Sequence, residues 1–263
     1  MKRIFILLCV VIFPVSIFAE EKETSVLIKT NVGKITVKLY NDTPLHRDNF
    51  LQMVDEQKYD SIMFHRVIKL FMIQAGEKYP PIDSTRFVQS RLNRSEPINP
   101  KSTGKFQKFI GKFRIKSEKK KNQIDINYWR DPDYKAPDHT IPAEIVFPKY
   151  FHKRGQLCAA RTEDKVNPER VSSGFQFFIV TGKHYTDNEL DKMERERNIT
   201  LTPEQREAYM IEGGAPHLDG AYTIFGEVTK GLRIVQKIEL TSTDPYDIPI
   251  KDMRIKTMKR LKR

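Results

Sequence analysis

Cysteine is almost absent from this chain, which has two in 263 residues. Cys9 lies in an apolar N-terminal run that we expect to be removed, so the mature protein keeps Cys158 as its single thiol. One cysteine cannot form an internal disulfide, and burial of apolar side chains must therefore hold the core together. Cys158 itself stands in an apolar run and is expected to be packed rather than reactive.

Histidine is also in short supply. The six histidines are scattered without the spacing of metal ligands, so we predict no metal site. No internal repeat is visible either. The chain is long enough for one sizeable core, or for one core with insertions.

The N-terminus has the pattern of a secretory signal peptide. Lys2 and Arg3 precede the apolar run Ile4–Phe18, and the small residue Ala19 follows. A membrane anchor is the alternative, but this run is shorter than the roughly 20 residues that a spanning helix needs. We therefore expect residues 1–19 to be cleaved and residues 20–263 to be exported as a single domain, with a bacterial periplasm as the simplest destination.

Positive charge is concentrated in one segment. The chain has a net charge of +12, and the stretch 86–130 holds 13 Lys and Arg against 3 Asp and Glu, a difference of +10. This stretch lies in a polar insert at about 79–138. The insert is expected to be a solvated loop or a contact for an anionic surface such as lipid or polysaccharide. Nucleic acid is not an expected partner of an exported protein.

Short segments of alternating apolar and polar residues predict many strands. Ser25–Lys29 and Gly33–Leu39 indicate a hairpin, and Thr43 with Pro44 predicts the N-cap and first residue of a helix. Further strands are expected at Met63–Val67, Met72–Gly76, Gln156–Ala160, Phe177–Val180, Tyr222–Val228 and Met253–Arg260, with a second helix at Leu232–Ile238. This pattern favours a mostly β fold whose sheet closes into a barrel.

A second insert, at about 183–214, has a helical pattern instead. Thr186 with Glu189, and Thr202 with Gln205, each match a capping box, and Pro203 suits a first helical position. We expect two short helices there that form a small hairpin.

The segment Met63–Glu77 is the most informative in the chain. It combines Arg66 and Gln74 with apolar side chains on what we expect to be paired strands. A hydrolase needs an activated nucleophile or a metal, and this segment offers neither. The combination suits a pocket that binds a peptide and stabilises one polarised carbonyl or nitrogen without covalent chemistry.

Three ordered blocks resemble the cyclophilin family of peptidyl-prolyl isomerases. They are Tyr59–Glu77 (YDSIMFHRVIKLFMIQAGE), Gly155–Arg161 (GQLCAAR) with Ser173–Thr181 (SGFQFFIVT), and Leu218–Val228 (LDGAYTIFGEV). The likeness covers roughly Ser25–Glu77 and Ile141–Thr257. It implies an eight-stranded antiparallel β-barrel capped by two helices, here with two large insertions, and cis–trans isomerisation of X-Pro bonds in proline-containing polypeptides without a cofactor.

The resemblance also assigns site residues. Arg66 takes the place of the catalytic arginine. The expected substrate-binding residues are Phe71, Met72, Gln74, Ala160, Gln176, Phe178, Leu218 and Tyr222. Since Phe177 and Phe178 are neighbours on a strand, one of them is expected in the core and the other in the groove.

The chain departs from the family pattern at several positions around the site. The departures are Lys69 and Leu70 in place of Pro-Gly, Ala75 in place of glycine, Arg161 in place of asparagine, and Phe175 in place of a small residue. His217 stands where cyclosporin-sensitive members carry tryptophan, so we expect weak or no cyclosporin binding. A second function stays open, in which the groove binds proline segments as a low-turnover module or chaperone while the inserts recruit partners.

Overall fold

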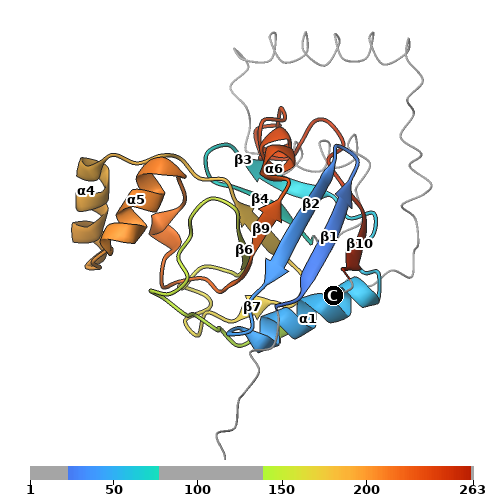
Figure 1. Cartoon of the computed structure of the whole chain (residues 1–263), viewed down its shortest axis with the longest axis horizontal. Helices are drawn as coiled ribbons and strands as arrows, with labels where there is room; N and C mark the ends of the chain where they lie inside the picture. The colour runs from blue at the N-terminus through green and yellow to red at the C-terminus, as the bar shows by residue number, and fades with distance from the viewer. Residues whose placement is uncertain (1–22, 77–138, 262–263) are drawn as a thin grey trace, which may run out of the picture.

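The computed structural model describes residues 23–76 and 139–261 (Figure 1). The expected signal peptide at 1–19 and the expected basic insert at about 79–138 lie outside these residues. None of the helices in the described ranges has the length and apolar content needed to cross a membrane.

Eight strands form one antiparallel sheet in the order β10-β1-β2-β9-β6-β8-β4-β3. The strands are β1 (Ser25–Thr30), β2 (Lys34–Leu39), β3 (Phe64–Ile68), β4 (Met72–Ala75), β6 (Gln156–Ala159), β8 (Phe177–Val180), β9 (Ile224–Lys230) and β10 (Ile255–Arg260). Two short strands, β5 (Thr140–Ile141) and β7 (Ser172–Ser173), pair separately. The sequence prediction of these eight sheet strands is confirmed, with shifts of one or two residues at their ends.

The prediction of a closed barrel is wrong, because the sheet curls into a half-barrel. Its edge strands β3 and β10 share no ladder and approach each other at the isolated bridge Met63↔Arg254. Beyond that bridge, the loop before β10 bonds to the edge of β3 instead of β10 itself. Val67 N donates to Asp247 O at 2.8 Å. A loop segment, rather than the last strand, therefore covers this part of β3.

Two helices cover the open ends of the curled sheet. Helix α1 (Pro44–Asp55) packs against β9 and β10, and α6 (Leu232–Glu239) packs against β2, β3 and β4 (Figure 1). The core between them is rich in aromatic rings, among which Phe50, Tyr59 and Phe177 are almost fully buried. Phe175 stacks on Tyr59 with ring centroids 4.9 Å apart. The large side chain at position 175 is thus a core residue and does not enter the groove.

Thr43 is the N-cap residue of helix α1 and Pro44 is its first residue, as predicted, but the side chain that caps the helix is a distant carboxylate. Thr43 precedes the helix, but its hydroxyl is buried and has no hydrogen-bond partner among the described residues. Glu144 instead accepts hydrogen bonds from Leu45 N at 3.0 Å and His46 N at 2.9 Å, and its Oε2 lies 2.7 Å from His46 Nδ1. A carboxylate at a helix N-terminus satisfies free N–H groups and complements the helix dipole.

The helical insert follows its predicted pattern. Helices α4 (Asp187–Arg197) and α5 (Pro203–Ile211) both begin with a complete capping box, at Thr186 and Thr202. The two helices stand to one side of the sheet (Figure 1). They bury Leu190, Leu201 and Tyr209 in a small cluster with Phe151, so the insert is packed onto the rest of the protein.

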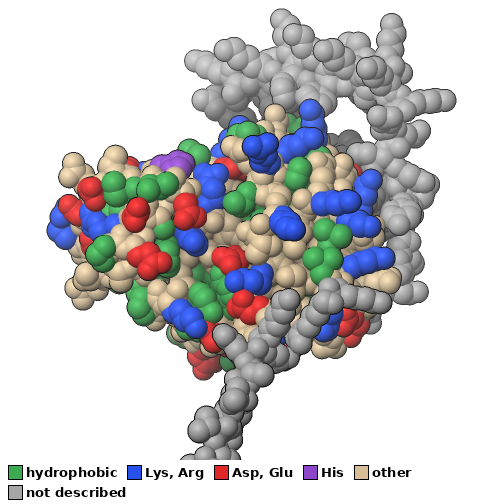
Figure 2. Space-filling model, in the orientation of Figure 1, with side chains coloured by type: hydrophobic (Ala, Val, Ile, Leu, Met, Phe, Trp, Pro, Cys, Tyr) green, Lys and Arg blue, Asp and Glu red, His purple; other side chains and the backbone are tan. Residues whose placement is uncertain are grey.

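Charged side chains are distributed unevenly on the face seen in Figure 2. Lys and Arg side chains predominate over the β1–β2 hairpin, whereas acidic and basic side chains are mixed over α4 and α5. Part of the hairpin charge is neutralised, because Lys38 lies 2.9 Å from Glu23 and 3.0 Å from Glu227.

We predict that Glu144→Ala destabilises the protein by about 2 kcal/mol, because it removes the cap of α1 and leaves His46 without its acceptor. Urea unfolding followed by circular dichroism measures the loss. Glu163→Ala, which removes an exposed glutamate, serves as the matched control and should change stability by less than about 0.5 kcal/mol. Equal losses in the two variants would contradict the capping role.

Candidate active site

The first part of the site is a row of polar side chains on β3, on β4 and at the residue just before β8. Arg66 on β3 lies opposite Gln74 on β4, and Arg66 Nη1 is 3.5 Å from Gln74 Oε1. Gln74 Nε2 donates in turn to Gln176 Oε1 at 2.9 Å. Gln74 therefore links the guanidinium to the second amide, and the three predicted polar residues lie side by side.

Arg66 is exposed enough to meet a ligand. Its side chain is 45% exposed, and its acidic partner among residues 23–76 and 139–261 is Asp247, with Arg66 Nε 3.7 Å from Asp247 Oδ2. An exposed pair at that distance contributes little to stability and competes weakly with a ligand. The guanidinium is thus neither buried nor locked into a buried ion pair.

The second part of the site is an apolar wall beside this row. Met72, Ala160, Phe178 and Leu218 belong to one buried cluster, and the rings of Phe71 and Tyr222 pack on it while remaining partly exposed. Register connects the two parts, because Gln74 pairs with Phe178 across β4 and β8. The structure therefore brings the predicted polar and apolar residues together on the outer face of the sheet.

Alternation along the strands separates this face from the core. Phe177 joins the main core with 1% of its surface exposed, whereas Phe178 joins the outer cluster. The prediction that the two phenylalanines point to opposite faces is confirmed. Cys158 belongs to the outer cluster too, and burial raises the pKa of its thiol well above the usual value, so it is packed and unreactive as expected.

Arg161 supports the wall instead of facing the groove. Its guanidinium lies 4.2 Å from the ring centre of Tyr222, donates to Ala221 O at 2.8 Å, and pairs with Asp164 at 2.6 Å. Its side chain is 3% exposed, so it cannot act as the asparagine of the family pattern does. Its contacts fix Tyr222, a supporting role that the sequence alone did not reveal.

The turn between β3 and β4 keeps its shape without Pro-Gly. Leu70 has φ +59°, a left-handed conformation that glycine adopts more easily. Two long-range contacts hold the turn: Leu70 N donates to Glu239 Oε1 at 2.8 Å, and Phe71 O accepts from Thr181 N at 2.9 Å. Glu239 is buried at the end of α6, and nothing in the local sequence connects it with this turn.

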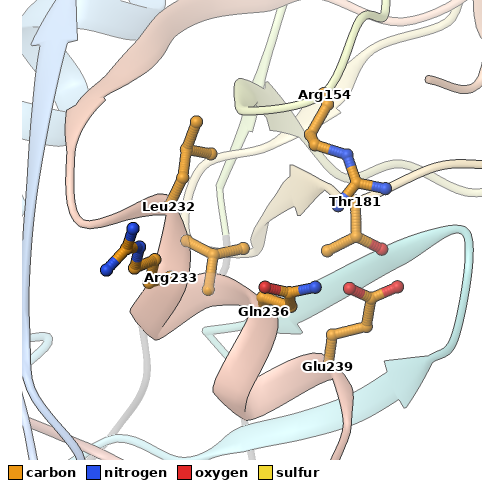
Figure 3. Close-up of a pocket in the computed structure, with 7 residues that line it drawn as sticks. Arg154, Thr181, Leu232, Arg233, Gln236 and Glu239 are labelled. Atoms are coloured by element: carbon orange, nitrogen blue, oxygen red, sulfur yellow. The ribbon is translucent and has the colours of Figure 1, made fainter. Parts of the chain in front are cut away.

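A cavity of about 160 Å³ lies behind the same turn (Figure 3). Its lining includes Arg154, Thr181, Gln236 and Glu239, and none of the predicted site residues. Arg154 is already engaged, because it donates to Glu212 O at 2.9 Å and to Gly182 O at 3.0 Å. The cavity is therefore separate from the surface that carries Arg66.

Two histidines near the site, His65 and His217, have lowered pKa values, which favours their neutral form. Burial, and to a smaller extent the neighbouring Arg66 charge, together lower the pKa of His65 to about 4. Burial also lowers the pKa of His217, whose ring centre lies 5.2 Å from that of Phe71. Arg66 therefore faces no charged histidine on its own strand.

Within residues 23–76 and 139–261, no three His, Cys, Asp or Glu side chains cluster closely enough to hold a metal ion.

Comparisons with known proteins agree with this arrangement. The family model described as cyclophilin type peptidyl-prolyl cis-trans isomerase/CLD matches residues 25–260. A Staphylococcus aureus (strain USA300) protein named "Putative peptidyl-prolyl cis-trans isomerase" is 27% identical over 240 residues, which is 91% of this chain and 92% of that protein.

A solved structure supports the fold. The crystal structure of a Cryptosporidium parvum cyclophilin type peptidyl-prolyl cis-trans isomerase matches with a TM-score of 0.52 and 22% identity, and the match covers 92% of this chain and 99% of that one. Since the family model spans nearly all of the described residues, this chain belongs to the cyclophilin-type peptidyl-prolyl cis-trans isomerase family.

Proposed function

We infer that this protein is a peptidyl-prolyl cis–trans isomerase that works without covalent chemistry. The observation that carries this conclusion is the exposed guanidinium of Arg66 beside an apolar wall, linked to two amides by the row Arg66–Gln74–Gln176. Family membership supports the same activity.

The reaction requires rotation about a peptide bond that resonance holds planar. The barrier is roughly 18–20 kcal/mol, and the uncatalysed change at a prolyl bond takes about 10–100 s. When the bond twists, the prolyl nitrogen loses conjugation and gains a lone pair. A donor that binds this nitrogen more strongly in the twisted state than in either planar state accelerates the rotation.

We assign Arg66 to the prolyl nitrogen. Arginine is always charged and has a rigid fork of donors, so one N–H can point at the nitrogen while another stays near Gln74. Phe71, Met72, Phe178 and Leu218 hold the pyrrolidine ring, and Ala160 and Tyr222 line the groove beside it. Gln74 donates to Gln176 Oε1, which turns the Gln176 amide so that its NH₂ group can serve the substrate backbone.

We predict that Arg66→Ala lowers kcat/KM about a hundredfold or more in a protease-coupled assay on a proline peptide, because it removes the charged donor that we assign to the developing lone pair. Arg66→Lys should recover part of the rate, since it keeps the charge but loses the fork. Arg195→Ala, an exposed arginine of α4, is the control and should leave the rate unchanged.

One result would favour the alternative function. If wild-type and Arg66→Ala proteins showed the same rate while both bound the peptide, the groove would act as a low-turnover binding module or chaperone and not as an enzyme. Circular dichroism of each variant checks that folding is intact.

We also propose that cyclosporin binds weakly or not at all. His217 occupies the position of the tryptophan of cyclosporin-sensitive members, and its smaller ring packs on Phe71. Calorimetry on the wild type should detect no sub-micromolar binding, and His217→Trp should tighten it. Tight binding by the wild type would refute this proposal.

Export and a role for the basic insert are further proposals, supported by the Lys2–Ala19 pattern and by the +10 charge difference within 86–130. The clients would then be proline-containing segments of exported proteins. We expect the mature protein to bind anionic vesicles in a salt-dependent manner, and deletion of 86–130 should remove this binding. Binding that survives the deletion would rule out this role for the insert.

A further inference from the structure

The helical insert is joined to one wall of the groove. It occupies the chain between β8, which carries Phe178, and the short 3-10 helix η2 (Pro216–Leu218), which carries Leu218. Both residues belong to the predicted substrate-binding set and to one buried cluster. The path of the chain between them is therefore set by α4 and α5.

Arg197, the last residue of α4, binds the backbone of η2 and the residue after it. Its Nη1 donates to Pro216 O at 3.2 Å and also to His217 O, and its Nη2 donates to Asp219 O at 3.1 Å. A three-residue 3-10 helix satisfies few of its own carbonyl groups. The planar guanidinium presents a rigid fork of donors to several carbonyls at once, whereas a lysine offers a compact ammonium on a flexible stem that is less well oriented for this.

Helix α5 holds the same segment from a second direction. Tyr209 Oη donates to Asp219 Oδ2 at 2.6 Å, and Asp219 Oδ1 lies 2.8 Å from both His152 N and His152 Nδ1. Asp219 and His152 are almost fully buried. The His152 ring stands edge-on to Tyr222 with centroids 6.3 Å apart, so this network also reaches the other side of the wall.

We propose that Arg197 is a positioning residue and that the helical insert is a working part of the proline-binding site. This inference rests on the proposed isomerase function. Arg197 does not touch the substrate. It fixes the backbone that presents Leu218, and thereby sets how well the wall fits the pyrrolidine ring. Arg66 lies on β3, outside this set of contacts, so substrate binding should depend on Arg197 more than the rotation step does.

The test compares Arg197→Ala and Arg197→Lys with Arg195→Ala, a control on the same helix turn. Arg197→Ala should raise KM about tenfold and change kcat less than about twofold, because a loosened wall misplaces the ring while the charged donor stays. Arg197→Lys should fall between the wild type and Arg197→Ala, and the control should match the wild type. In Arg197→Ala, backbone hydrogen exchange should be faster than in the wild type at Leu218 N and at Ala221 N. In the wild type these groups donate to Ala215 O and Leu218 O, respectively.

Three outcomes would overturn the proposal. Unchanged KM despite faster exchange in η2 would show that wall position does not govern binding. A fall in kcat at constant KM would assign Arg197 to the rotation step instead. Equal effects of Arg195→Ala would indicate a general effect of charge on α4.

Two further measurements keep the test decisive. If Arg197→Ala unfolds, Tyr209→Phe replaces it, since this change removes the hydrogen bond to Asp219 and keeps the ring in its cluster.

If the wild type shows no isomerase activity, the proposed function fails, but NMR titration with a proline peptide still tests Arg197. In that case Arg197→Ala should weaken peptide binding about tenfold, and unchanged affinity would refute the positioning role.

Discussion

The site depends above all on the register of β3, β4 and β8. In that register Arg66 pairs with Gln74 and Gln74 pairs with Phe178, so a cation, an amide and an aromatic ring stand in one line on the outer face. Ile73 and Phe177, the residues that precede Gln74 and Phe178 along their strands, enter the core. A slip of one residue would exchange the two faces, burying the polar row and exposing the core, so core burial holds the site in register.

Charged side chains from distant segments then fix the backbone around the sheet. Glu144 caps α1, Glu239 accepts from the β3–β4 turn, and Arg197 donates to η2. In each case a charged group bonds to backbone N–H or C=O groups that local structure leaves unsatisfied. Such bonds are stronger than neutral ones, and each joins a turn or helix end to a distant segment without a disulfide.

The departures from the family pattern become understandable in this setting. Leu70 adopts a left-handed conformation that Glu239 and the strand β8 help to hold, so the turn keeps its place without glycine. Arg161 gives up contact with the groove and supports Tyr222 from the side. Phe175 fills core volume beside Tyr59. These changes alter the support of the site while Arg66 and the two glutamines keep their arrangement.

The sequence by itself predicted the strands, the helices with their capping boxes, and a set of residues that the fold brings together around Arg66, because alternation, caps and the ordered family blocks are local signals. It misjudged the closure of the sheet, and it placed the N-cap residue of α1 correctly but missed the side chain that caps the helix. Both depend on which distant group reaches an unsatisfied backbone N–H, as Asp247 reaches Val67 and Glu144 reaches His46. Only the tertiary structure decided these contacts and the hydrogen bonds from Arg197 to η2. Their partners are brought together by the path of the chain, and no spacing in the sequence indicates them.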